Sequence, residues 1–209
     1  GPKTGHFLDQ RANRLLVGSM SSGRSVLDVF ASTGGFSVHA AAGGALSVHA
    51  IDQSAPTIAV AERNMAYNMD REKVAACEFT TQCADAFDAL GGLGRSDRRF
   101  DFIVIDPPSF AQRASTVGRA KAAYAKLTKL ALGVIEPGGV LVQASCSSRV
   151  TSEDFFDTVT AAAVEHGGRL TEIRRTAHDI DHPVTFPEGA YLKAGFWRVD
   201  PGRRGRRRG

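Results

Sequence analysis

The sequence predicts an α/β fold with a doubly wound, mostly parallel β-sheet. Short apolar runs rich in Val, Ile, Leu and Phe alternate along the chain with segments whose apolar residues have helical spacing. Repeated strand–helix units of this kind favour a parallel sheet covered by helices on both faces. The length of 209 residues is enough for one sizeable core, and the sequence has no internal repeat.

Three strand–helix units are expected in the first half of the chain. The predicted strands cover residues 25–30, 46–52 and 77–82. The segment GGFSVHAAAGG after the first strand predicts a short Ala-rich helix closed by glycines. Ser54 is the expected N-cap of a second helix, whose apolar side chains are Ile58, Ala61, Met65 and Met69. Asp85 and a short helix follow the third strand.

The second half adds four strands and two helices. The predicted strands cover residues 102–105, 140–145, 170–175 and 194–199. One helix is expected over residues 120–135, after which the segment EPGG breaks it. The other begins at Thr151 and Ser152, followed by two acidic residues, and runs to about His166.

Much of the basic charge lies at the C-terminal end. The chain has 26 Lys and Arg against 22 Asp and Glu. The last nine residues, PGRRGRRRG, hold five arginines, and without them 21 basic residues face 22 acidic ones. We interpret residues 201–209 as a basic disordered tail that either contacts RNA phosphates or only solubilises the protein. Three cysteines suggest no disulfide framework, and no membrane-spanning or signal-peptide pattern is found, so the expected location is the cytoplasm.

Polar side chains lie where the predicted strands end. Asp28 and Asp52 close the first two strands, and Asp85 follows the third. Asp106 follows the fourth strand and Cys146 the fifth. An acidic residue in such a place is often only a helix cap. Because ligands bind beyond the carboxyl ends of parallel strands, however, this joint occurrence predicts a functional rim.

The turn after the first strand predicts a nucleoside ligand that lacks phosphates. Its sequence is DVFASTGGF, in which Gly34 and Gly35 permit close approach of a ligand to the backbone. The turn is not the G-x-G-x-x-G of dinucleotide enzymes, and no lysine accompanies it as in a P-loop. Asp52 is suited to accept hydrogen bonds from ribose hydroxyls and Asp85 from an adenine amino group. S-adenosyl-L-methionine is such a ligand.

Five segments, in order between Lys3 and about Val199, carry a family resemblance. They are KTGHFLDQRANR, VLDVFASTGGFSVHAAAGGA, FDFIVIDPPSFA, PGGVLVQASCSS and DHPVTFPEGAYLKA. Together they resemble the ribosomal RNA large-subunit cytosine-C5 methyltransferase family. The resemblance implies a class I, Rossmann-like methyltransferase domain over residues 1–200, with a seven-stranded sheet whose last strand is antiparallel. It also implies S-adenosyl-L-methionine as methyl donor and RNA, expected to be large-subunit ribosomal RNA, as partner.

The resemblance also bears on domains and on the cofactor site. Such proteins typically carry an N-terminal PUA RNA-binding domain, and this chain begins where that domain would end. The segment HFLDQR would lie over the cofactor, with Gln10 and Arg11 able to meet its carboxylate. The predicted cofactor-binding residues are Phe7, Gln10, Arg11, Asp28, Phe30, Ser32, Thr33, Gly34, Asp52, Gln53, Asp85, Ala86 and Asp106. No metal site is predicted, because His178 and His182 have a usable spacing but no helical context.

The segment DPPSF after the fourth strand is the predicted substrate site. Proline lacks an amide hydrogen and has a fixed φ, so the two prolines end the strand and make the backbone behind Asp106 rigid. The carboxylate of Asp106 is then expected to recognise N3 and the amino group of a flipped cytosine. The predicted substrate-binding residues are Pro107, Pro108, Ser109 and Phe110.

Cys146 and Asp106 are the predicted catalytic residues. C5 of a pyrimidine becomes nucleophilic only after a group adds to C6, and a cysteine thiolate is the usual agent. By the family resemblance, the segment SCSS supplies this thiol, whereas Cys77 and Cys83 are interpreted as packing residues. Two other functions stay open. One is a nitrogen methyltransferase of the same fold, in which Cys146 is incidental, and the other is a non-catalytic RNA-binding module.

Overall fold

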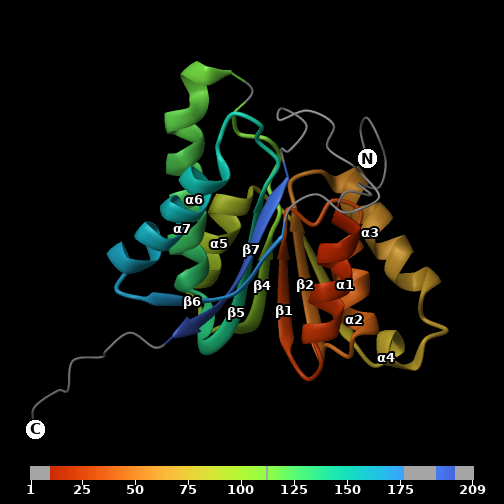
Figure 1. Cartoon of the computed structure of the whole chain (residues 1–209). Helices are drawn as coiled ribbons and strands as arrows, with labels where there is room; N and C mark the ends of the chain where they lie inside the picture. Colours follow the sequence, from red (N-terminus) through yellow and green to blue (C-terminus); the bar gives the residue numbers. More distant parts are fainter. Residues whose placement is uncertain (1–9, 112, 177–191, 201–209) are drawn as a thin grey trace, which may run out of the picture.

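The computed structural model describes residues 10–111, 113–176 and 192–200. A seven-stranded sheet with the order β3-β2-β1-β4-β5-β7-β6 forms its centre (Figure 1). The strands are β1 (Ser25–Val29), β2 (Ser47–Asp52), β3 (Glu78–Cys83), β4 (Phe100–Ile105), β5 (Ile135–Ser145), β6 (Arg169–Thr176) and β7 (Lys193–Asp200). The helices are α1 (Arg11–Met20), α2 (Gly35–Ala42), α3 (Ala55–Tyr67), α4 (Glu72–Ala75), α5 (Ala86–Gly94), the 3-10 helix η2 (Ala114–Thr116), α6 (Val117–Leu132) and α7 (Ser152–Glu165). Among these residues, no helix has the length and apolar character that crossing a membrane requires.

The pairing of the strands confirms the predicted fold class. Strands β1 to β5 pair in parallel, whereas β7 is antiparallel to both of its neighbours, β5 and β6. The order of the strands reverses at the centre, where β1 has β2 on one side and β4 on the other. In open α/β sheets, ligands bind beyond the carboxyl ends of the strands at such a reversal.

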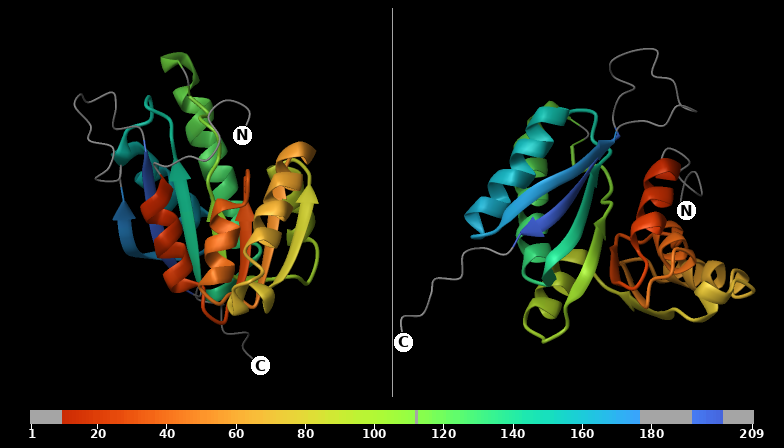
Figure 2. Two further views of the ribbon diagram at one scale, coloured as in Figure 1. Left: turned by 90° about the vertical axis from the view of Figure 1, so that its right-hand side faces the viewer. Right: turned by 60° about the horizontal axis from the view of Figure 1, so that its bottom comes forward.

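Helices bury both faces of the sheet. In two different views, α1 to α4 lie on one face and α5 to α7 on the other (Figures 1 and 2). Val26, Phe102 and Val104 pack on the first face, whereas Leu27 and Ile103 pack on the second. Because successive residues of a strand point to opposite faces, burial on both sides produces the continuous apolar runs from which the strands were predicted.

The structure corrects the predicted elements at four places. The helix expected over residues 120–135 ends at Leu132, and Ile135 already begins β5. The segment EPGG lies inside this strand, where the pairing with β4 shifts register between Phe100 and Phe102. Met69 lies beyond the end of α3 and is exposed. Helices α1 and α4 are present although the sequence-based predictions do not include them.

A buried carboxylate connects β1 to the helices packed on it. Asp28 is 1% exposed, and Ser37 of α2 donates a hydrogen bond from Oγ to its Oδ2 over 2.6 Å. The positive charge of Arg14 in α1 also favours the charged form of this carboxyl. Burial nevertheless raises the pKa of Asp28 to about 6, because the loss of hydration outweighs these interactions.

The raised pKa of Asp28 predicts a stability that depends on pH. The carboxyl has a pKa of 3.8 when unperturbed and about 6 in the fold. The folded protein therefore binds this proton more tightly, and the free energy of unfolding should fall as the pH rises through this interval. Asp28→Asn removes the buried charge and keeps an acceptor for Ser37, so it should raise the free energy of unfolding at pH 7 by about 1–3 kcal/mol.

Urea unfolding at pH 4 and pH 7 tests this prediction. The matched control is Asp88→Asn, because Asp88 is exposed on α5 and its replacement should change the stability little at either pH. A lower stability of Asp28→Asn at pH 7 would contradict the expectation. It would mean that the interaction of the carboxylate with Arg14 outweighs its cost of burial.

Candidate functional site

Residues from distant parts of the chain meet at the carboxyl ends of the parallel strands. Asp52 closes β2, and Asp85 follows β3. Asp106 follows β4 and Cys146 follows β5, and these two strands are parallel neighbours in the sheet. These residues therefore lie along one edge of the sheet, where the sequence places them. Phe7, another predicted site residue, lies outside the described residues.

The loop between β1 and α2 has a strained backbone. Phe30 and Ser32 have φ angles of 63° and 50°, in the left-handed region that non-glycine residues rarely adopt. Such residues cost on the order of 1–3 kcal/mol each and persist only where the surroundings hold them. One of the restraints is the N–H of Ser32, which donates to Oδ2 of Asp52 over 3.0 Å. Strain of this kind clusters at ligand-binding backbone.

Gly34 lets this loop lie directly against α3. Its φ is 78°, and a Cβ on Gly34 would lie 2.9 Å from the Cβ of Ala61. Any other residue at this position would therefore be strained and would press on α3. On the same helix, Asn64 donates from Nδ2 to the carbonyl oxygen of Thr33 over 2.8 Å. The loop is thus fixed between α3 on one side and Asp52 on the other.

Asp52, at the end of β2, and Asp85, after β3, both accept hydrogen bonds from nearby backbone N–H groups. Oδ2 of Asp52 accepts from Ser32, as described, and Oδ1 accepts from the N–H of Ser54 over 3.0 Å. Asp85 caps α5, because its Oδ1 accepts from the N–H groups of Phe87 and of the next residue, over 2.9 and 3.2 Å. A carboxylate has about four acceptor positions, so both residues retain capacity for a ligand.

The remaining predicted cofactor residues differ in their exposure. Arg11 and Gln53 are exposed, Thr33 is half-buried, and Ala86 is buried in the first turn of α5.

A chain of hydrogen bonds orients Asp106. Gln10 is buried and donates from Nε2 to Oδ1 of Asp106 over 2.9 Å. Oε1 of Gln10 accepts from Nδ2 of Asn13 over 2.6 Å, and Oδ1 of Asn13 accepts from Oγ1 of Thr176 over 2.6 Å. The chain connects the ends of β4 and β6 through the start of α1. The sequence predicts that Gln10 meets the carboxylate of the cofactor, whereas the structure bonds its amide to Asp106 and Asn13.

The thiol of Cys146 lies against the proline turn. Its Sγ is 3.7 Å from the carbonyl oxygen of Pro107, and the residue is partly exposed. Cys77 is buried, as its predicted packing role requires. Cys83 is exposed, so the prediction that it is a packing residue is wrong. Of the three cysteines, Cys146 is the one whose thiol contacts the proline turn.

The rest of the proline turn is only partly open to solvent. Pro108 is exposed, whereas Ser109 and Phe110 are half-buried. The ring centroid of Phe110 lies 6.4 Å from that of Phe30 and 5.2 Å from that of Tyr124. Phe110 therefore links the loop after β1 to α6, and only part of its ring is available to a substrate.

A buried group of hydroxyls lies under the segment that carries Cys146. The hydroxyl oxygen of Tyr124 is 2.8 Å from Oγ of Ser145 and 3.0 Å from Oγ of Ser147. Burial raises the pKa of Tyr124, and the negative charges of Cys146 and Asp106 act in the same direction. The hydroxyl of Tyr124 consequently stays neutral beside both predicted catalytic residues.

Lys193 is a buried group that the sequence-based predictions omit. It begins β7 directly opposite Ser145 and is 3% exposed. Its Nζ donates to the carbonyl oxygens of Ser147 and Val150 over 2.7 and 2.5 Å. Burial lowers the pKa of Lys193 to about 8, while the charge of Cys146 acts in the opposite direction. The signal in the sequence is a lysine within the otherwise apolar segment YLKAGFW.

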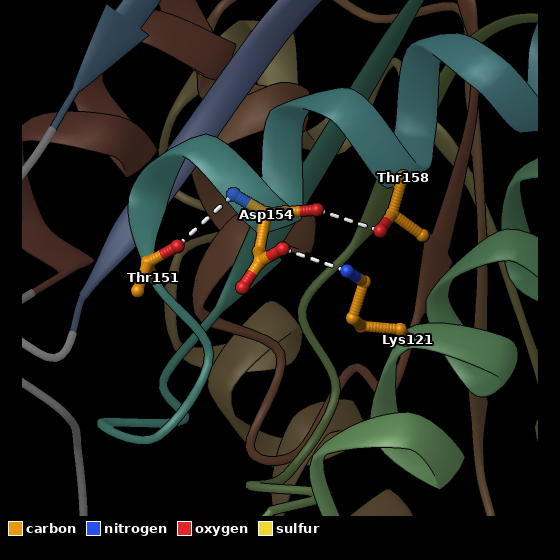
Figure 3. A network of polar contacts seen from close by, with 4 residues as sticks. All are labelled: Lys121, Thr151, Asp154 and Thr158. Atoms are coloured by element: carbon orange, nitrogen blue, oxygen red, sulfur yellow. Dashed lines mark hydrogen bonds and ion pairs between the residues drawn. The ribbon is translucent and has the colours of Figure 1, made fainter.

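The segment after Cys146 ends at the capped N-terminus of α7, shown in Figure 3. Thr151 is the N-cap, as predicted, and its Oγ1 accepts from the N–H of Asp154 over 3.1 Å. Nζ of Lys121 in α6 donates to Oδ1 of Asp154 over 2.6 Å, which lowers the pKa of this carboxyl. Thr158 donates to the carbonyl oxygen of Asp154 one turn later. These contacts hold the start of α7 against α6.

The acceptors around the β1 loop fit S-adenosylmethionine. Oδ1 of Asp28 is buried and has no hydrogen-bond partner among the described residues. With Asp52 and Asp85 it forms a set of carboxylates that suits amino and hydroxyl groups, and no lysine lies in the loop to bind a phosphate. In the part of the chain that the structure describes, no group of three or more His, Cys, Asp and Glu could hold a metal ion. His178 and His182 lie outside it.

Known proteins resemble the chain over nearly its whole length. A family profile described as S-adenosylmethionine-dependent methyltransferase matches residues 1–196. A protein of Deinococcus radiodurans named ribosomal RNA large subunit methyltransferase is 42% identical over 200 residues, which are 96% of this chain and 48% of that protein. Ribosomal RNA large subunit methyltransferase I of Pseudoalteromonas atlantica is 37% identical over 202 residues, or 95% of this chain and 50% of that protein.

A solved structure gives the same result for the fold. The crystal structure of SMU.776 complexed with SAH superposes with a TM-score of 0.78 at 26% sequence identity, and the match covers 94% of this chain and 50% of that chain. The chain spans about half the length of the curated relatives it matches. Since the family profile covers residues 1–196, the chain belongs to the S-adenosylmethionine-dependent methyltransferase family.

Proposed function

We propose that this chain methylates C5 of a cytosine in RNA, through a covalent bond between Cys146 and C6 of the base. The observation that carries the proposal is the contact between Sγ of Cys146 and the carbonyl oxygen of Pro107, at 3.7 Å. A nucleophile for C6 and a rigid carboxylate for the other edge of the base thus lie on adjacent strand ends. A nitrogen methyltransferase would have no use for a thiol at this position.

The proposed RNA is large-subunit ribosomal RNA. The names of the relatives from Deinococcus radiodurans and Pseudoalteromonas atlantica support this choice. We assign the catalytic domain to residues 1–200 and an RNA-contacting role to the arginines of residues 201–209, whose charge suits a phosphate backbone.

The residues proposed to hold S-adenosylmethionine surround the strained loop. Asp52 is assigned to the ribose hydroxyls, Asp85 to the adenine amino group, and the backbone of residues 30–34 to the methionine part. The proposed set is completed by Phe7, Arg11, Asp28, Gln53 and Ala86, and Gln10 takes part through Asp106. When bound, the cofactor supplies a methyl group as an electrophile.

The residues proposed to bind the RNA base have different roles. Asp106 accepts a hydrogen bond from the amino group and shares a proton with N3, because N3 is itself an acceptor, while Pro108, Ser109 and Phe110 border the ring. The thiolate of Cys146 gives its electron pair to C6, and the π pair of the C5–C6 bond becomes available at C5. After methylation, a base takes the C5 proton, the C5–C6 double bond forms again, and the S–C6 bond breaks with its pair returning to sulfur.

Asp52→Ala should weaken binding of S-adenosylmethionine and S-adenosylhomocysteine. Loss of a charge-assisted hydrogen bond costs on the order of 1.5–3 kcal/mol, which is roughly a ten- to hundredfold increase in Kd. Isothermal calorimetry measures this change. Glu62→Ala is the matched control, because Glu62 is an exposed acid on α3 that bonds Thr81. Equal affinity of Asp52→Ala and the parent would remove Asp52 from the cofactor site.

Cys146→Ala should abolish methyl transfer to RNA while leaving cofactor affinity unchanged, because the thiol faces the base. A methyl-transfer assay at saturating RNA measures the loss of activity, and a thermal melt of the same variant shows whether it is folded. Cys83→Ala is the control and should keep full activity, since Cys83 is an exposed cysteine at the end of β3, away from the proline turn.

A trapping experiment gives a second readout for Cys146. RNA that carries 5-fluorocytosine should remain bonded to the parent protein, because fluorine replaces the proton that must leave. Retained methyl transfer in Cys146→Ala, together with no adduct in the parent, would exclude the covalent mechanism. The Asp106–Pro107–Pro108 turn would then favour transfer to a base nitrogen.

A further inference from the structure

We infer that Lys193 is a positioning residue for the nucleophile, which holds the segment after Cys146 and whose positive charge stabilises the Cys146 thiolate. This inference rests on the proposed function, because it assigns a role around the same thiol. It concerns a residue of β7, which is the only antiparallel strand among the described strands of the sheet.

The register of the sheet places Lys193 beside the nucleophile. Lys193 pairs with Ser145, the residue directly before Cys146. From there its side chain reaches the turn that follows Cys146, where Nζ bonds the carbonyl oxygens of Ser147 and Val150. The same carbonyl of Ser147 accepts the N–H of Val150 over 3.3 Å. The ammonium group thus bonds the carbonyl oxygens of the first and last residues of a four-residue turn that directly follows Cys146.

Other contacts make this segment rigid from its remaining sides. Oγ of Ser147 lies 3.0 Å from the hydroxyl of Tyr124 and 3.2 Å from Oγ of Ser109, and it accepts the N–H of Ala111 over 3.3 Å. The turn after β4 and the turn after β5 are therefore bonded to each other. With Lys193 on the third side, the thiol has little freedom to move relative to the proline turn.

A neutral donor would suffice if the turn needed only hydrogen bonds. An ammonium group that is 3% exposed loses much of its hydration, and its bonds to two carbonyl oxygens offset part of this cost. A positive group near a cysteine favours the thiolate, which is the form that attacks C6. The negative charge of Cys146 acts to raise the pKa of Lys193, as expected of two groups close enough to interact.

Alkylation of Cys146 tests the inference without RNA or cofactor. The rate of reaction with iodoacetamide follows the thiolate fraction, and mass spectrometry of the peptides separates Cys146 from Cys83. Lys193→Gln keeps a donor for the turn but removes the charge. It should slow alkylation of Cys146 at pH 7 on the order of tenfold, equivalent to a shift of one unit in the pH profile. Lys193→Arg keeps the charge and should retain most of the rate.

Two controls separate the effect of the Lys193 charge from a general change in the structure. Cys83 in the same molecule is exposed and should react at the same rate in every variant. Arg198→Gln removes an exposed cation from the same strand and should leave the pH profile of Cys146 unchanged. Hydrogen exchange at β7 verifies that the alkylated molecules are folded.

The outcomes distinguish this inference from the proposed function. An unchanged pH profile of Cys146 in Lys193→Gln, or equal slowing in Lys193→Gln and Lys193→Arg, overturns the role of the charge. The proposed function would still stand if Cys146→Ala remained inactive. Conversely, methyl transfer by Cys146→Ala would overturn the proposed function even if Lys193 controlled the reactivity of the thiol.

Discussion

The position of β1 between β2 and β4 is the constraint on which the site depends. Because the strand order reverses there, most residues proposed for the cofactor lie at or after the ends of β1, β2 and β3, whereas Asp106 and Cys146 follow β4 and β5. The two groups meet where the N–H of Asp106 donates to the carbonyl oxygen of Val29 over 3.3 Å and where Phe30 touches Phe110. A methyl donor and its acceptor must approach each other along such a boundary, and the topology of the sheet creates it.

The strands and the rim could be predicted because local signals coincide with the fold. Burial on both faces makes the parallel strands apolar throughout, and the caps Ser54 and Thr151 bond the helix termini that follow them. Helix α1 could not be predicted in the same way. Part of its buried surface consists of Asn13 and Arg14, so it lacks the apolar periodicity that identifies a helix.

The partners of the buried polar groups are what the sequence could not reveal. Lys193, Gln10 and Asp28 each bond or face a partner from another element, and nothing near them in the sequence indicates that partner. Buried polar groups require such partners, because an unpaired one costs more than a hydrogen bond contributes. Their contacts therefore depend on tertiary structure alone. They also lie next to the residues proposed for the chemistry, so the contacts that position those residues could not be predicted.

The pairing of β1 with β4 also affects the order in which the parts of the site fold during translation. Ser25 is bonded to Asp101, 76 positions later in the chain, whereas β1, β2 and β3 pair with nearer neighbours. Closing the longer loop costs more entropy, and ribosomes deliver the N-terminal half first. The strand ends of β1, β2 and β3 are thus expected to assemble before those of β4 and β5. In a nascent chain, Cys146 would acquire its neighbour Lys193 only when the last strand has emerged.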